Sequence, residues 1–106
     1  MVDRNSIAEF TRRIIQEFHP ERIILFGSYA SGTPAEDSDV DLLVILPFQG
    51  SGIRKALDIV DEIAPRIPVD LVVRTPEEVR QRLAWNDFFL REIMEKGQVL
   101  YESAHS

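Results

Sequence analysis

The apolar residues of this chain recur at two different spacings. Ile7, Phe10 and Ile14 are three or four residues apart, which predicts an amphipathic helix over residues 4–18. The almost uninterrupted apolar run from Val40 to Leu46 predicts a strand that is buried on both faces. Because helices and strands alternate along the chain, we expect an α/β domain. Further strands are expected at 22–26, 69–73 and 98–101, and further helices at 28–32, 53–64 and 75–96, the last in two pieces.

The last pair of predicted helices carries two local signals. The segment Thr75–Glu78 has the pattern of a helix start, with a capping threonine, a proline in the first turn and a glutamate three positions after the cap. Further along, Trp85, Phe88 and Phe89 stand at helical spacing. We expect these aromatic side chains to pack in the core, and a partner-binding face is the alternative.

Composition and charge narrow the class of protein. The 106 residues predict a single domain, 1–106, in which about 102–106 form a frayed tail. Since the sequence has no cysteine, neither a disulfide framework nor a thiolate zinc site is possible. We find no apolar leader and no stretch long enough to span a membrane, so we expect a cytoplasmic protein. The net charge of −6 argues against large non-specific binding to nucleic acid.

Four acidic residues, Glu36, Asp37, Asp39 and Asp41, lie close together before and within the strand at 40–46. We expect Glu36 and Asp37 to be solvated loop acids. Side chains two positions apart in a strand point to the same face, so the carboxylates of Asp39 and Asp41 project together. Oxygen ligands of this kind suit Mg²⁺, and the pair could hold one or two such ions for phosphoryl or nucleotidyl transfer.

Asp70 is the one charged residue in the apolar run from Ile67 to Val73. A charge in the middle of an apolar strand is costly unless it is paired or bound to a metal. If this strand neighbours the one at 40–46, Asp70 lies beside Asp39 and Asp41. Divalent metal would then remove the repulsion among the three carboxylates.

Gly27 and Ser28 follow a predicted strand and open a helical turn. A glycine lets a phosphate approach the backbone, and the N–H groups and the hydroxyl can donate to it. Together with the carboxylates, this pair predicts a metal–triphosphate site. Three other motifs fail in detail: Gly27–Gly32 lacks the lysine of a P-loop, Asp37–Asp41 lacks the later glycine and glutamate of an EF-hand, and the Asp-x-Asp of phosphatases follows its strand.

The order Gly27-Ser28, Asp39-Val40-Asp41 and Asp70 resembles the pattern of the polymerase beta-like nucleotidyltransferase superfamily, and within it that of the minimal nucleotidyltransferases, over nearly the whole chain. The resemblance implies a mixed four-stranded sheet flanked by helices, and transfer of a nucleoside monophosphate with release of pyrophosphate. It also implies that Asp39 and Asp41 ligate Mg²⁺, that Asp70 completes the metal site and helps to activate the attacking hydroxyl, and that Gly27 and Ser28 hold the β- and γ-phosphates.

Many small members of this family are MntA-type antitoxins paired with a helical HEPN-domain RNase toxin. The resemblance therefore implies that ATP is the substrate and that AMP is transferred to a tyrosine of such a toxin. Ser31 stands where the Gly-Ser-x-Ala-Arg-Gly segment of this group has its arginine. Two alternatives remain open: a non-catalytic antitoxin or binding module with a vestigial nucleotide site, and nucleotidyl transfer to a small-molecule acceptor.

Overall fold

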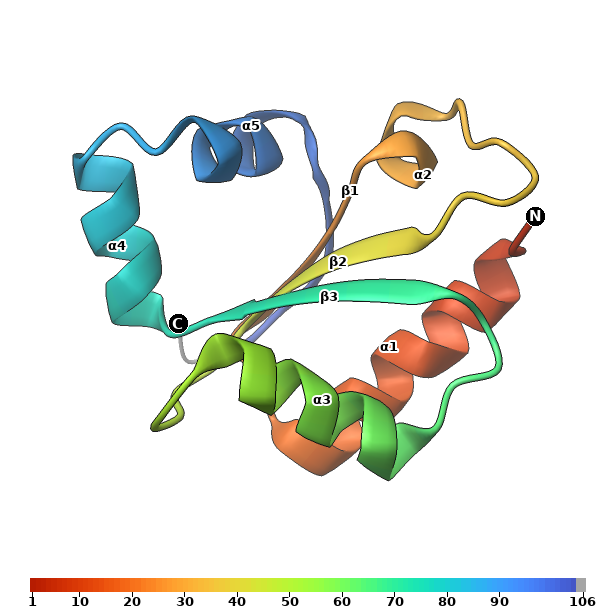
Figure 1. Cartoon of the computed structure of the whole chain (residues 1–106), viewed down its shortest axis with the longest axis horizontal. Helices are drawn as coiled ribbons and strands as arrows, with labels where there is room; N and C mark the ends of the chain where they lie inside the picture. The colour runs from red at the N-terminus through yellow and green to blue at the C-terminus, as the bar shows by residue number, and fades with distance from the viewer. Residues whose placement is uncertain (105–106) are drawn as a thin grey trace.

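In the computed structural model, which describes residues 1–104, four strands form one sheet that five helices flank (Figure 1). The strand order is β3-β2-β1-β4, in which β1 pairs antiparallel with β2 and β4 whereas β2 and β3 are parallel. This mixed sheet confirms the predicted fold class. None of the helices within residues 1–104 has the length and apolar character needed to cross a bilayer. The elements are α1 (Arg4–Phe18), β1 (Arg22–Phe26), α2 (Ser28–Ser31), β2 (Val40–Ile45), α3 (Gly52–Ile63), β3 (Val69–Arg74), α4 (Pro76–Ala84), α5 (Phe88–Lys96) and β4 (Gln98–Glu102).

Local signals fix where the helices begin and end. The capping box predicted at the start of α4 is present, because Thr75 accepts a hydrogen bond from the Glu78 N–H and the Glu78 carboxylate accepts one from the Thr75 N–H. The helices α1 and α3 end at His19 and Ala64, both in the left-handed conformation with φ near 50°. His19 directly precedes a proline, which disfavours continuation of the helix.

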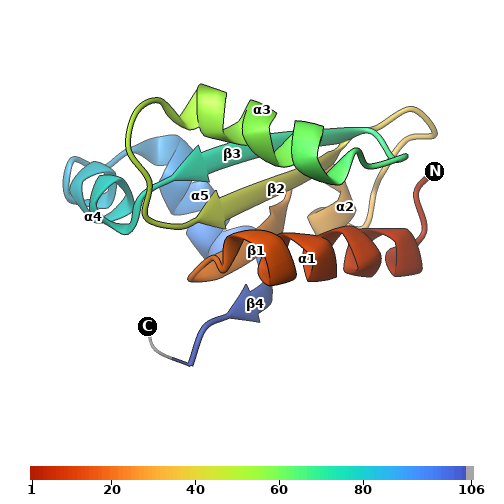
Figure 2. The ribbon, with the colours of Figure 1, turned by 90° about the horizontal axis from the view of Figure 1, so that it is seen from below.

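Different helices cover the two faces of the sheet. The helices α1 and α3 lie side by side on one face (Figure 2) and pack against Val40, Leu42 and Val44 of β2. The helices α4 and α5 lie on the other face, where they pack against Leu43 and Ile45. Because successive side chains of a strand alternate between faces, β2 contributes to both halves of the core, as its apolar run predicts.

The three aromatic residues around the α4–α5 connection are exposed. The exposed fractions are 70% for Trp85, 80% for Phe88 and 49% for Phe89, so the expectation that they pack in the core is wrong. The helix α5 instead buries Leu90 against the sheet. Phe89 is the member of the three that touches a neighbouring ring, since it packs edge-on against Phe26 with ring centroids 5.7 Å apart.

The last described residues are tied to the sheet. The Glu102 carboxylate pairs with Arg22 of β1 at 2.6 Å. The Ser103 N–H donates to the Glu21 carbonyl at 2.8 Å. The tail predicted for 102–106 therefore overlaps β4, and its residues 105–106 lie outside the described residues.

Candidate active site

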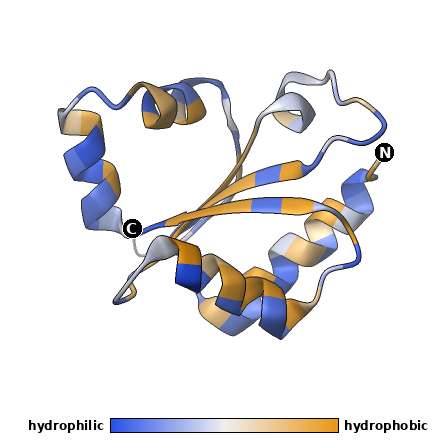
Figure 3. Cartoon of the chain, in the orientation of Figure 1, coloured by the Kyte–Doolittle hydropathy of each residue, from blue (hydrophilic) through white to orange (hydrophobic). Residues whose placement is uncertain are grey.

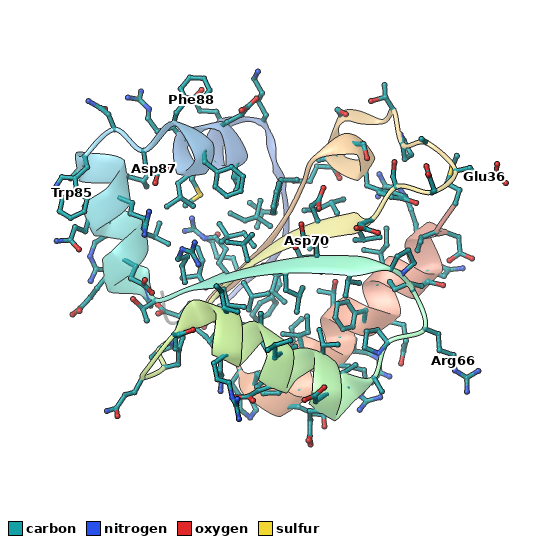
Figure 4. The ribbon with its side chains drawn as sticks, viewed as in Figure 1. Glu36, Arg66, Asp70, Trp85, Asp87 and Phe88 are labelled. Atoms are coloured by element: carbon teal, nitrogen blue, oxygen red, sulfur yellow. The ribbon has the colours of Figure 1, made fainter. Side chains whose placement is uncertain are left out.

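Two carboxylates stand opposite each other on neighbouring strands. The parallel register of β2 and β3 pairs Asp41 with Asp70, which meets the condition under which Asp70 is expected to lie beside Asp41. Both residues are second in their strands, and the alternation of side chains places both on the α4/α5 face. Figure 3 shows a hydrophilic band near the start of each of the two strands, at matching places. In Figure 4, Asp70 lies on the side of β3 that is turned away from α1 and α3.

The carboxyl of Asp41 has a perturbed pKa. Partial burial raises the pKa of its carboxyl above the ordinary value of 3.8, and the charges of Asp70 and Asp39 raise it further. Asp39 is exposed and directly precedes β2, two positions before Asp41. The three predicted carboxylates therefore form one electrostatic group, although two strands supply them.

Asp70 is exposed, although it interrupts an apolar run. The strand β3 lies at an edge of the sheet, and its side chains are only partly buried at most positions. The expectation that the Asp70 charge must be paired or bound because it sits inside an apolar strand is therefore wrong, since water reaches this carboxylate. What singles out Asp70 is its alignment with Asp41.

Gly27 brings the end of β1 against the carboxylate of Asp41. Its neighbour Phe26 is the residue opposite Asp41 in the antiparallel pair of β1 and β2. The backbone of Gly27 has φ 73° and ψ −153°, a region that only glycine readily adopts. A Cβ atom at this position would lie 2.2 Å from Oδ2 of Asp41. Glycine is thus required here both by the backbone conformation and by the close approach of Asp41.

The short helix α2 presents backbone donors next to this carboxylate. The Gly27 carbonyl accepts hydrogen bonds from the N–H groups of Ala30 and Ser31, both at 3.1 Å. The first N–H groups of a helix, here those of Ser28 and Tyr29, have no acceptor within the helix. Together with the Ser28 hydroxyl, they are suitable donors for a phosphate oxygen. The hydroxyl of Ser31 donates to the Ser28 carbonyl at 3.1 Å, so this serine closes the turn instead of projecting a charge.

A groove that the sequence did not predict adjoins Gly27. It has a volume of about 510 Å³ and lies between α2 and α5, over the end of β1. Its lining includes Ala30 and Ser31 on one side and Phe89, Ile93 and Lys96 on the other. No local pattern could reveal it, because its walls come from segments that only the folded sheet brings together.

The carboxylates have the donor chemistry that a hard divalent cation prefers. As the side chains lie, however, no group of three or more histidine, aspartate or glutamate residues within 1–104 is arranged to hold a metal ion. Asp41 and Asp70 therefore offer an aligned pair of carboxylates. The residues fit Mg²⁺ because that ion keeps several waters and uses few protein ligands.

Comparison with known proteins shows what the chain is similar to. It is 28% identical over 105 residues to "Putative protein adenylyltransferase MJ0604" of Methanocaldococcus jannaschii, a match that covers 95% of this chain and 100% of that protein. It is 45% identical over 73 residues to "Putative protein adenylyltransferase MJ1305" of the same organism, a match that covers 63% of this chain and 50% of that protein.

The fold has solved counterparts. A toxin–antitoxin crystal structure with AMP-PNP matches with a TM-score of 0.55 and 23% identity, over 98% of this chain and 77% of that chain, which shows a shared fold. The family model described as "Nucleotidyltransferase domain" matches residues 7–100. Because this match spans most of the sequence, the chain belongs to the nucleotidyltransferase domain family and is a nucleotidyltransferase enzyme.

Proposed function

We propose that this chain is an Mg²⁺-dependent protein adenylyltransferase of the cytoplasm, and that it acts as an antitoxin by transferring AMP from ATP to a HEPN-domain toxin. The observation that carries the proposal is the alignment of Asp41 with Asp70 at the point where Gly27 packs on Asp41. Two relatives are named as protein adenylyltransferases, and a solved structure of the same fold is a toxin–antitoxin with AMP-PNP. Both facts support a protein acceptor and an adenine nucleotide.

In this proposal the acids and the donors have separate tasks. Asp39, Asp41 and Asp70 hold the Mg²⁺, which when bound offsets the negative charge on the α-phosphate and on the leaving pyrophosphate. The N–H groups at the start of α2 and the Ser28 hydroxyl donate to the β- and γ-phosphates. Gly27 allows the phosphates to approach the backbone closely.

The acceptor hydroxyl comes close to Asp70 on the α4/α5 face of the sheet. The acceptor hydroxyl oxygen attacks the α-phosphorus, the bond between this phosphorus and the α,β-bridging oxygen breaks, and pyrophosphate leaves with the bonding electrons. The hydroxyl proton passes to the carboxylate of Asp70. Because Asp70 is exposed on an edge strand, a side chain of another protein can come close to it.

The proposed AMP transfer is tested with two ATP samples that carry a label on different phosphates. Purified protein is incubated with a HEPN-domain toxin, Mg²⁺ and ATP that is labelled in either the α- or the γ-phosphate. We expect the α-label to appear on the toxin and the γ-label to appear in pyrophosphate, with no transfer when EDTA replaces Mg²⁺. A γ-label on the toxin would instead indicate a kinase.

A matched pair of variants connects this activity to the site. Asp39→Ala with Asp41→Ala should abolish the transfer, whereas Glu36→Ala with Asp37→Ala should leave it unchanged, because the latter two are exposed loop acids only a few residues away. Complex formation without any label transfer would contradict the enzymatic proposal and favour a non-catalytic antitoxin. Label that is recovered only in low-mass products would favour a small-molecule acceptor.

A further inference from the structure

Three large aromatic side chains form an exposed corner where α4 meets α5. We call Trp85, Phe88 and Phe89 the aromatic corner; their exposed fractions are 70%, 80% and 49%. Figure 4 shows Trp85 and Phe88 pointing outward, away from the sheet. Scattered exposed apolar residues are normal, but three large aromatic side chains exposed within five positions concentrate apolar surface at one connection, and such a concentration often marks an interaction site.

An arginine that has no ion-pair partner in the described part of the chain lies close in sequence to this corner, in a chain that is acidic as a whole. Residues 80–91 contain Arg80, Arg82 and Arg91 against the single acid Asp87, a net charge of +2 in a chain with a total of −6. Arg82 pairs with Asp87 at 3.2 Å, and Arg91 pairs with Glu95 at 3.9 Å. Among residues 1–104, Arg80 has no ion-pair partner. Arginine and aromatic residues are the types enriched at the centres of protein–protein interfaces.

The corner is continuous with the catalytic face of the sheet. Phe89 packs on Phe26, the residue opposite Asp41, and it lines the groove that Gly27 also lines. The helices α4 and α5 cover the same face from which Asp41 and Asp70 project. A macromolecule that rests on the corner therefore lies beside a groove that reaches Gly27, whose backbone lies against the Asp41 carboxylate.

We infer that the aromatic corner is the docking surface for the acceptor protein, whose complementary surface is apolar with an acidic rim. This inference rests on the proposed function. A second copy of this chain fits less well, because two copies meeting through this surface would bring their arginines together. Nucleic acid also fits less well, because the net charge of −6 repels a phosphate backbone.

The experiment compares two pairs of exposed apolar residues on opposite faces of the sheet. Trp85→Ser with Phe88→Ser removes the outer part of the corner and leaves Phe89 in the groove. The matched control is Ile53→Ser with Leu57→Ser on α3, where the exposed fractions are 76% and 54%. The HEPN-domain toxin of the labelling experiment is the probe. For both variants we measure the dissociation constant for the toxin and the dissociation constant for ATP. We also measure the KM and kcat of label transfer to the toxin.

We expect the corner variant to bind the toxin about 10- to 100-fold more weakly and to raise the KM for the toxin by a similar factor, as loss of a central aromatic contact does. Its affinity for ATP and its melting temperature should stay unchanged. The α3 variant should bind the toxin as the wild type does. Arg80→Glu should bind the toxin more weakly than the wild type, and added salt should reduce that difference in affinity. Unchanged toxin binding by the corner variant, an equal loss in the α3 variant, or competition by a short RNA would overturn the inference. If wild type binds the toxin without labelling it, the proposed function fails while the binding comparison still decides the role of the corner.

Discussion

Gly27→Ala tests whether the end of β1 sets the position of the Asp41 carboxylate. Alanine at φ 73° and ψ −153° occupies a region that costs about 1–3 kcal/mol. Its Cβ would also lie 2.2 Å from Oδ2 of Asp41, so that side chain must rotate, at a further cost of about 0.5–1.5 kcal/mol. We therefore expect the free energy of unfolding to fall by both amounts and the adenylyl transfer to be lost with the displaced carboxylate.

A double-mutant cycle separates the two contributions. In an Asp41→Ala background the carboxylate is absent, and the remaining Cβ of residue 41 is 3.4 Å from the new methyl group, an ordinary contact. The free energy of unfolding, measured with urea for the four proteins of the cycle, should show that Gly27→Ala costs about 0.5–1.5 kcal/mol less in this background. Equal costs in both backgrounds would refute the idea that Gly27 and Asp41 are in contact.

Gly32→Ala supplies the control for backbone strain. Gly32 has φ 80° and a Cβ added there meets nothing within 4 Å. This variant should lose about 1–2 kcal/mol of stability, the cost of a left-handed residue, yet retain the transfer activity. If its activity falls as far as that of Gly27→Ala, strain in α2 rather than the contact with Asp41 explains the loss.

Three further predictions concern charge, capping and the core. Because folding raises the pKa of Asp41, the protonated carboxyl contributes its full stabilisation below about pH 3.8, and this contribution is lost as the pH rises through the folded-state pKa. In urea unfolding with EDTA present, Asp41→Asn should therefore have a larger free energy of unfolding than the wild type at pH 7, and the difference should vanish below pH 3.8. Thr75→Ala removes the cap of α4 and should cost about 1 kcal/mol by the same method, whereas no change would mean that the capping box contributes nothing. Leu43→Ala should lower the free energy of unfolding by about 2–5 kcal/mol because the side chain is fully buried, and a loss below 1 kcal/mol would contradict that packing.

Periodicity identified the elements because each buried face repeats with the geometry of its own backbone. The run from Val40 to Leu46 predicted the central strand, and β2 is buried at every position except Asp41. The local chemistry of the Thr75–Glu78 segment was sufficient to place the start of α4. Signals of this kind depend on a few neighbouring residues, so the sequence displays them directly.

The errors arose where burial depends on elements distant in sequence. Helical spacing groups Trp85, Phe88 and Phe89, but it does not tell whether another element covers them, and none within residues 1–104 covers the first two. The apolar run around Asp70 suggested a buried strand, whereas the position of β3 at the sheet edge leaves the carboxylate in water. The groove beside Gly27 was missed for the same reason. The alignment of Asp41 with Asp70 was predictable only once the two strands were assumed to be neighbours.

The pairing of β1 with β4 joins residues that are far apart in the sequence: Arg22 and Glu102 are separated by 80 positions. Contacts of such long range form slowly, because the loop between them must be ordered before the pairing contributes any stability. During translation, β1, which Gly27 directly follows, and the strands that carry Asp41 and Asp70 leave the ribosome while one edge of β1 is still unpaired. An unpaired edge is a template for another chain. The arrival of β4 therefore ends the interval in which β1, a central strand of the finished sheet, is itself an open edge, after every residue of the candidate active site has already been made.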